Sequence, residues 1–410
     1  LMGMGALGFM VGSGGSALVS RTLGEGDRDK AEGIFSMLVY VTLAAGVALA
    51  LLGQLFLRPI AAALGAEGEM LENSVLGLLF LRPIAVLLGA QGAMLEDCVV
   101  YGGILLAGQT MFMLQNVFQS FFVVAERPHL GLTVTVAAGL TNMTLDFLFV
   151  GVLGFGLPGA AAATVLSECL GGLAPMFYFF SRNTSLLHLG PTRLDGLALF
   201  QTCTNGASEL MTNLSMSLVN MLYNLQLMRL AGENGVAAYG VIMYVNFIFV
   251  SIFLGYSMGC APVIGFHFGA AHRDELHNLF RKSLTLVALT GCALTLIAAG
   301  LAATLSRLFV GYDPELFTLA RHGLRLYSLS FLLVGFNIFG SAFFTALGNG
   351  AVSACISFLR TLLFQVAAVL LLPLVLRVDG IWLAIVVAET LALLVTVRFF
   401  LGKRNTYGYA

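Results

Sequence analysis

Two acidic residues lie inside long apolar stretches, where a carboxylate could bind a proton or a metal cation. Asp146 belongs to the segment GLTNMTLDFLFV, and Glu209 belongs to NGASELMTNLSMSLVNMLYNLQL. An ionised carboxylate at the centre of a bilayer costs roughly 2.5–3.5 kcal/mol on insertion scales, so such residues mark ion or proton sites. Each of the two is therefore a candidate site for H⁺ or Na⁺.

Asp146 ends a stripe of small and polar residues on its predicted helix. At 100° per residue, Thr135, Gly139, Asn142 and Asp146 fall within about 60° of one another. Counted from His129, Asp146 lies about 25 Å along the helix, toward the outer half of the membrane. The alternative to a cation site is a carboxyl that bonds Asn142 or Thr135 and only holds helices together.

Glu209 begins a longer polar stripe that runs for about four helical turns. Its members project into one sector of about 80°, and they are Glu209, Asn213, Ser217, Asn220 and Asn224. A polar sector inside a membrane faces water, a ligand or a partner helix. We interpret it as the wall of a substrate cavity that Tyr244 also faces, with interhelical hydrogen bonding as the alternative.

Long apolar helices must position these residues, and the composition of the chain indicates that such helices are present. Of the 410 residues, 59% are hydrophobic and 10% are charged, whereas roughly a quarter are charged in a soluble protein. Apolar runs long enough to cross a bilayer predict an all-α membrane protein with eleven spans, at about 1–20, 34–57, 99–124, 130–153, 158–180, 197–228, 236–268, 284–306, 323–346, 351–376 and 380–401. Because the first run begins without a polar leader, we expect a truncated start and a missing first helix.

The charged connections predict the orientation. Twelve Lys and Arg residues lie on one side of the predicted spans and seven on the other, and the richer side should be cytoplasmic. That side includes the C-terminus, so we expect a multi-pass protein of the plasma membrane with a cytoplasmic C-terminus. The net charge of −1 offers no basic face for nucleic acid.

Two internal repeats occur. A short one duplicates residues 55–72 as 79–96, and we interpret the extra copy as an extension of an extracellular loop that arose by recent duplication or by an assembly artefact. An older repeat relates Asn116, Ser120 and Glu168 to Asn337, Ser341 and Glu389 at a constant offset.

The older repeat predicts an N-lobe of five spans, residues 1–190, and a C-lobe of six spans, residues 191–410. Both halves enter the bilayer from the same side, which makes a parallel repeat. Such repeats enclose a central site and support alternating access by rocking, so Asn116 and Asn337 join the candidate cleft residues.

Enzymatic chemistry is not expected. The loops GEGDRDKAEGIF and GAAHRDELHNLF lack the GK[ST] ending of a P-loop. The six cysteines show no spacing typical of a metal or redox pair, and no Ser–His–Asp set is visible. We therefore expect no cofactor and no metal beyond Na⁺ at Asp146 or Glu209, with energy drawn from a proton or sodium gradient.

Three segments closely resemble the multidrug and toxic compound extrusion (MATE) transporters: GFMVGSGGSALVSRTLGEGDRDKAEGIF, TNMTLDFLFVGVLGFGLPGAAAATVLS and NGVAAYGVIMYVNFIFVSIFLGYSMGCAPVIGFHFGAAHRDEL. The resemblance implies twelve helices in two six-helix lobes around a V-shaped central cleft, and efflux driven by inward H⁺ or Na⁺ flow. It matches the family's membrane acid on the fifth helix to Asp146 and the acid on the seventh to Glu209. Some members carry an acid on the tenth helix, where Asn337 is the nearest polar group here.

We therefore predict a cation-coupled antiporter that exports organic cations, drugs or metabolites by alternating access. Its expected partners are a small-molecule substrate and membrane lipid, and it is expected to act as a monomer. One alternative is a flippase for lipid-linked precursors of the same superfamily, although such a cleft should be more basic than Arg360 alone makes it. The other is a degenerate membrane protein that does not transport.

Overall fold

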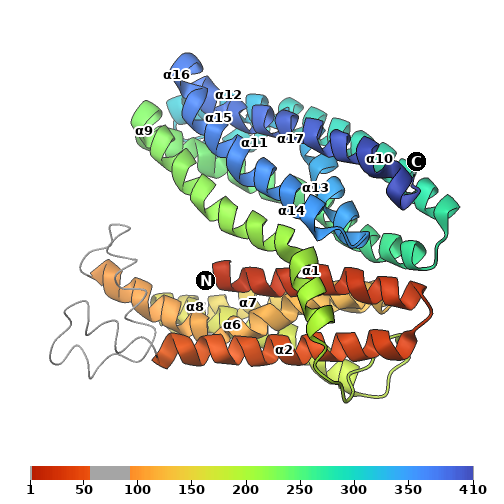
Figure 1. The fold of residues 1–410 in the computed structure, drawn as a ribbon. Coiled ribbons are helices and arrows are strands. Elements are labelled where there is room, and N and C mark those ends of the chain that lie inside the picture. The colour runs from red at the N-terminus through yellow and green to blue at the C-terminus, as the bar shows by residue number, and fades with distance from the viewer. Residues whose placement is uncertain (1, 56–92, 410) are drawn as a thin grey trace. The chain divides into compact units, whose positions relative to one another are not determined.

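The computed structural model describes residues 2–55 and 93–409, and every regular element in these ranges is a helix (Figure 1). The predicted all-α class is therefore confirmed. The duplicated segment, 55–72 and 79–96, lies outside the described residues except at its two ends.

The chain divides into two compact units, and each is described by itself below. The first unit comprises Leu1–Gly12 and Asp29–Leu199, and the second comprises Ser13–Arg28 and Phe200–Ala410. The helix α1 (Met2–Gly24) therefore contributes residues to both units. The lobe boundary expected between residues 190 and 191 stays a prediction.

The first unit is built from long helices that surround a core of aromatic rings. Phe35 lies 4.8 Å from Phe121 and 5.0 Å from Phe179, measured between ring centroids. These contacts join α2 to its neighbours, while α8 packs against both α6 and α7. The elements are α2 (Arg28–Leu55), α6 (Ala93–Val124), α7 (Pro128–Asp146), the π-helix η1 (Phe147–Val152) and α8 (Gly156–Phe180).

The second unit has a larger number of elements. They are α9 (Gly196–Gly269), α10 (Arg273–Gly300), α11 (Ala302–Val310), α12 (Pro314–Ser328), α13 (Phe331–Ala346), α14 (Gly350–Phe358), the π-helix η2 (Leu359–Phe364), α15 (Gln365–Leu371), α16 (Pro373–Leu376) and α17 (Val378–Tyr407). The segment from α14 to α16 forms one apolar stretch, 350–376, which matches a predicted span.

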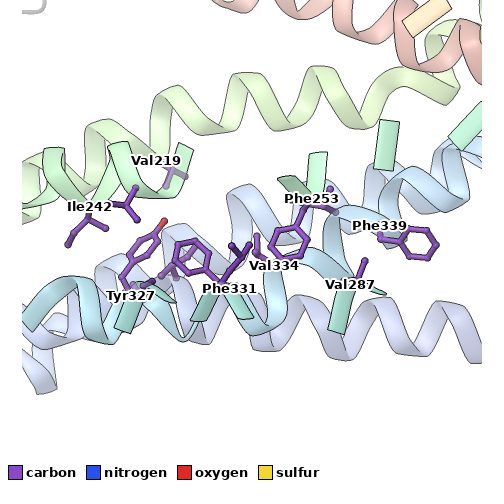
Figure 2. Packing of buried hydrophobic residues seen from close by; sticks show 14 of the residues in the cluster. Val219, Ile242, Phe253, Val287, Tyr327, Phe331, Val334 and Phe339 are labelled. Atoms are coloured by element: carbon purple, nitrogen blue, oxygen red, sulfur yellow. The ribbon is translucent and has the colours of Figure 1, made fainter. Parts of the chain in front are cut away.

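Side chains from α9, α10, α12 and α13 fill the core of the second unit (Figure 2). Phe253 of α9 and Val287 of α10 lie against α13, whose Phe331, Val334 and Phe339 line the same core. A Cβ on Gly335 would come within 2.8 Å of Val287. The helices therefore pack closely, as membrane helices do where small residues let them approach.

The element α9 is two helices joined at Gly232. That glycine has φ 62° and ψ −154°, a backbone conformation that essentially only glycine adopts. The break falls between the predicted spans 197–228 and 236–268, so the sequence placed it correctly.

Seven helices are long and apolar enough to cross a membrane, or eight when the bent pair α12 and α13, which meet at 49°, counts as one span. One of the seven is α9, which carries two predicted spans. Each of the eleven predicted spans overlaps a helix of the structure. These counts refer to the described residues.

Gly350→Ala is expected to lower the stability of the second unit. A Cβ at Gly350 would collide with the carbonyl oxygen of Thr204 and would also press on Asn205 Cα. Because these are backbone atoms, relief requires the helices to separate, and such overpacking costs about 1–3 kcal/mol. The melting temperature of the detergent-solubilised protein should fall.

Gly255→Ala in α9 is the matched control, since nothing lies within 4 Å of the added Cβ. It should leave the melting temperature unchanged or raise it slightly, because alanine favours the helix by about 1 kcal/mol over glycine. Equal melting temperatures for the two variants would contradict the close approach at Gly350.

Candidate functional site

In the first unit, Asp146 is the last residue of α7, immediately before the π-helix η1. Its Oδ1 atom is buried and has no hydrogen-bond partner among the described residues. Asn142 turns its amide to Thr164 instead, with 3.5 Å between Nδ2 and Oγ1, and Thr135 donates to the carbonyl of Gly131 at 2.9 Å. The interpretation in which Asn142 or Thr135 holds the carboxyl therefore has no support at Oδ1.

In the second unit, Arg360 forms an ion pair with Glu389. Its Nε lies 2.8 Å from Glu389 Oε1, and the two side chains are only 13% and 2% exposed. Asn337 donates to the other carboxylate oxygen at 2.7 Å and to the Glu389 carbonyl at 3.0 Å. Thr396 donates in turn to Asn337 Oδ1 at 2.8 Å. The Glu389 carboxylate is thus held by charge and by hydrogen bonds, as a buried ion requires.

Glu209 belongs to the same group of charges. It is partly buried on α9 and interacts electrostatically with the Arg360 guanidinium. One guanidinium therefore serves two carboxylates, of which Glu389 has the direct contact. If both acids are ionised, the group has one negative charge in excess, which a proton or a monovalent cation could balance.

Tyrosines connect Asn220 to this group. The Tyr239 hydroxyl donates to Asn220 Oδ1 at 2.9 Å, and the Tyr239 ring stacks on Tyr223 at 5.0 Å. The Tyr223 hydroxyl is buried and has no hydrogen-bond partner among the described residues. Both Tyr223 and Tyr327 interact electrostatically with Glu389. The second unit therefore holds a polar cluster, here called the Arg360 cluster, that contains Glu209, Asn220, Tyr223, Tyr239, Tyr327, Asn337, Arg360, Glu389 and Thr396.

The other predicted cleft residues have different surroundings. Asn213 donates to the Glu209 carbonyl at 2.8 Å, whereas Ser217 and Asn224 are exposed. Tyr244 is 64% exposed and stacks on Phe309 at 5.7 Å. In the first unit, Asn116 is buried and donates to the carbonyl of Phe112 at 2.8 Å. The role of these residues in a substrate cleft stays a prediction.

Both charged sites coincide with a π-helix. Asp146 directly precedes η1, and Arg360 is the second residue of η2. π-helical turns are rare and occur frequently at functional sites. The same kind of backbone irregularity thus marks one position in each unit.

The ion pair between Arg360 and Glu389 was missed by sequence reasoning, because the two residues lie on different helices and no short spacing joins them. The available signal was Arg360 itself, since an arginine inside an apolar span needs an acidic partner. The repeat makes Glu168 and Glu389 equivalent, yet it is Glu389 that pairs with an arginine. Among the described residues, no group of three or more His, Cys, Asp or Glu side chains could hold a metal ion.

Comparisons with a family model and with known proteins indicate the same family. The family model described as MatE matches residues 1–75 and 210–370. The multidrug export protein MepA of Staphylococcus haemolyticus is 24% identical over 408 residues, which cover 98% of this chain and 82% of the relative. MepA of Staphylococcus saprophyticus is 22% identical, over 96% of this chain and 81% of the relative.

Solved structures show the same fold. A crystal structure of MATE in complex with MaL6 superposes with a TM-score of 0.87 at 22% identity, and covers all of this chain and 87% of its own. An outward-facing multidrug resistance MATE family transporter of the MOP superfamily gives a TM-score of 0.87 at 22% identity. The match covers 100% of this chain and 86% of that structure's chain. Since the MatE model matches more than half of its residues, the chain belongs to the MATE family of multidrug efflux transporters, which are multi-pass membrane transporters and not enzymes.

Proposed function

We propose that the chain is a cation-coupled antiporter of the plasma membrane that exports amphipathic organic cations, drugs or metabolites by alternating access. Inward movement of H⁺ or Na⁺ drives export, and no bound cofactor takes part. The C-terminus is cytoplasmic, and the protein works as a monomer with a small-molecule substrate and the surrounding lipid as its partners.

The observation that carries this proposal is the buried Oδ1 atom of Asp146, which has no hydrogen-bond partner among the described residues. A buried ionised group needs a counter-charge, because desolvation otherwise costs several kcal/mol. A proton, a sodium ion or the cationic group of a substrate each supplies one. These ligands exclude one another at a single carboxylate, so cation entry releases the substrate.

Glu209 supplies the second coupling carboxylate, in the second unit. Arg360 already has its direct contact with Glu389, so Glu209 is the acid whose charge remains for a transported cation to balance. Coupling then follows if each cation binds with different affinity in the inward-open and outward-open states. Asn142, Asn213 and Asn220 provide amide groups for the substrate in the same two regions.

The flippase alternative needs a free basic group for a lipid-linked pyrophosphate. The engagement of Arg360 by Glu389 and Asn337 argues against it. A degenerate protein that does not transport remains the second alternative, and direct measurement of transport distinguishes it from an antiporter.

The test is transport by the purified chain in proteoliposomes, with ethidium or norfloxacin as the probe. A pH gradient and a sodium gradient are imposed separately, and the expected result is probe movement against its own gradient with at least one of them. Probe movement that neither gradient accelerates would contradict the antiporter. Empty liposomes and liposomes with heat-inactivated protein are the controls.

A further inference from the structure

Four buried hydroxyl groups of α13 and α14 form one continuous chain, here called the hydroxyl seam. Thr345 Oγ1 lies 2.7 Å from Ser353 Oγ, which lies 2.8 Å from Ser341 Oγ, which lies 2.9 Å from Ser357 Oγ. All four side chains are 8% exposed or less. The two helices that carry them pack against each other.

The hydrogen bonds of the hydroxyl seam can run in either direction. In each of the three contacts, either oxygen can be the donor. A hydroxyl has one proton to donate and two lone pairs to accept with. A chain of such groups can therefore receive a proton at one end, release another at the far end and reorient afterwards.

The hydroxyl seam leads from a helix end to the Arg360 cluster. Gly350 begins α14, and Arg360 lies about 15 Å further along the helix at 1.5 Å per residue. Ser357 is one turn before Arg360, and Thr361 donates to the Ser357 carbonyl at 2.7 Å. At the other end, the Thr345 carbonyl accepts a hydrogen bond from Asn205 Nδ2 at 2.8 Å.

Two polar atoms of α9 indicate that a small ligand completes the path. Asn205 Oδ1 and Ser208 Oγ are buried and have no hydrogen-bond partner among the described residues. The amide nitrogen of Asn205 donates to the backbone carbonyl of Thr345, so Asn205 contacts α13 at the residue that ends the seam. Ser208 follows one turn later and directly precedes Glu209. Water satisfies such atoms where two or more polar groups converge.

The first unit indicates that the scaffold does not need these hydroxyls. The repeat offset that relates Ser120 to Ser341 also matches four other residues of the seam region to residues of the first half, and all four matched residues are apolar. Thr345, Ser353, Ser357 and Arg360 correspond to Val124, Leu132, Val136 and Gly139, respectively. The same pair of helices therefore folds without the polar groups, which argues against a role in helix packing alone.

The spacing of the hydroxyl seam suits a proton and not a sodium ion. Adjacent hydroxyl oxygens bond directly at 2.7–2.9 Å, so no ion fits between them without breaking the chain. A proton needs no such space, because each oxygen passes on a proton that it already holds.

We propose that the hydroxyl seam is a proton relay between Glu209 and the helix ends near Thr345, which makes H⁺ the ion exchanged at this carboxylate. This inference rests on the proposed function and assigns its coupling ion in the second unit. Glu209 gives its proton to the seam at the Ser357 end, and water at Asn205 takes the proton released at the Thr345 end. Each transfer breaks one O–H bond and forms another, and bulk water accepts the final proton, so no group is oxidised or reduced.

The test measures proton release when ethidium binds to purified protein in detergent, followed with a pH-indicator dye in a stopped-flow instrument. Asp146→Asn is the background, so that Glu209 is the remaining candidate carboxyl. Ser353→Ala interrupts the chain in its middle and should slow proton release by at least about tenfold, as expected when a positioned proton-transfer group is lost. The equilibrium amount of bound ethidium should not change.

Ser306→Ala is the matched control, because Ser306 is fully buried in α11 and its Oγ atom has no partner among the described residues. It should release protons at the parental rate. Ser353→Thr keeps a hydroxyl and should retain most of the rate. If Ser353→Ala fails to fold, Ser357→Ala removes the hydroxyl at the end of the chain that lies nearest to Arg360. Proton release by the parent should also slow in D₂O.

The outcomes separate this inference from the proposed function. Unchanged release in both alanine variants, or no proton release by the parent, would overturn the relay. Release of sodium instead of a proton from the Asp146→Asn protein when ethidium binds would also overturn it while leaving the antiporter intact. Release that depends on the seam, in a chain that transports nothing, would support the relay and contradict the antiporter.

Discussion

Asp146→Asn is expected to abolish gradient-driven efflux and at the same time to make the protein more stable. The carboxamide has the shape of the carboxylate but carries no charge and cannot exchange a proton, so efflux should fall by about a hundredfold or more. The buried Oδ1 atom has no hydrogen-bond partner among the described residues. Removal of that charge should therefore raise the melting temperature, because an unpaired buried charge is costly.

The opposite signs distinguish a coupling site from a structural one. A carboxylate that only holds helices together would lose stability on the same substitution. Glu315→Gln is the control, since it removes an exposed acid from the first turn of α12 and should change both quantities little. Ethidium efflux in a drug-sensitive host and the melting temperature in detergent are the measurements. Efflux that survives in Asp146→Asn would exclude this residue as a coupling site.

Arg360→Met is expected to destabilise the second unit by about 3–5 kcal/mol, because it leaves the Glu389 carboxylate buried without its counter-ion. The side chain of Glu389 is 2% exposed and cannot reach water for compensation. A large fall in melting temperature should follow, together with loss of efflux as the arrangement around Glu209 changes.

The double variant Arg360→Met/Glu389→Met should recover most of this stability, since a buried ion pair can often be replaced by apolar residues at little cost. Asp379→Asn is the control, because it changes an exposed ion pair and not a buried one. It removes the carboxylate charge from the exposed contact between His322 and Asp379 at 2.9 Å and should cost at most about 1 kcal/mol. A double variant as unstable as Arg360→Met would contradict the ion-pair explanation, and efflux by it would show that transport does not need the pair.

The long helices could be predicted from the sequence because apolar runs of bilayer length favour them. Each apolar run of bilayer length overlaps a helix among the described residues, and the break between the two predicted spans of α9 falls where Gly232 has a positive φ. The duplicated segment could not be tested in this way, because it lies outside the described residues except at its ends.

The candidate site was predictable only where its residues share one helix. Helical spacing placed Glu209 and Asn220 on one stripe, and both belong to the Arg360 cluster. It could not show that Asn337 binds Glu389, because that contact depends on how α13 and α17 pack. The hydroxyls of Ser341, Thr345, Ser353 and Ser357 were not singled out from the sequence, because small hydroxyl residues are common in membrane helices and their contacts depend on how α13 and α14 pack.

The two π-helices have a consequence for insertions and deletions. A π-turn holds one more residue than an α-turn, so it shifts the register of everything that follows by about 100° around the helix axis. Residues before and after η2 therefore follow two different periodicities, because α15 continues directly from it, and a single-residue deletion within Leu359–Phe364 would restore one uninterrupted α-helix. Such a shortened chain would keep its composition and its hydropathy, yet it would turn every later side chain of that span toward a different neighbour.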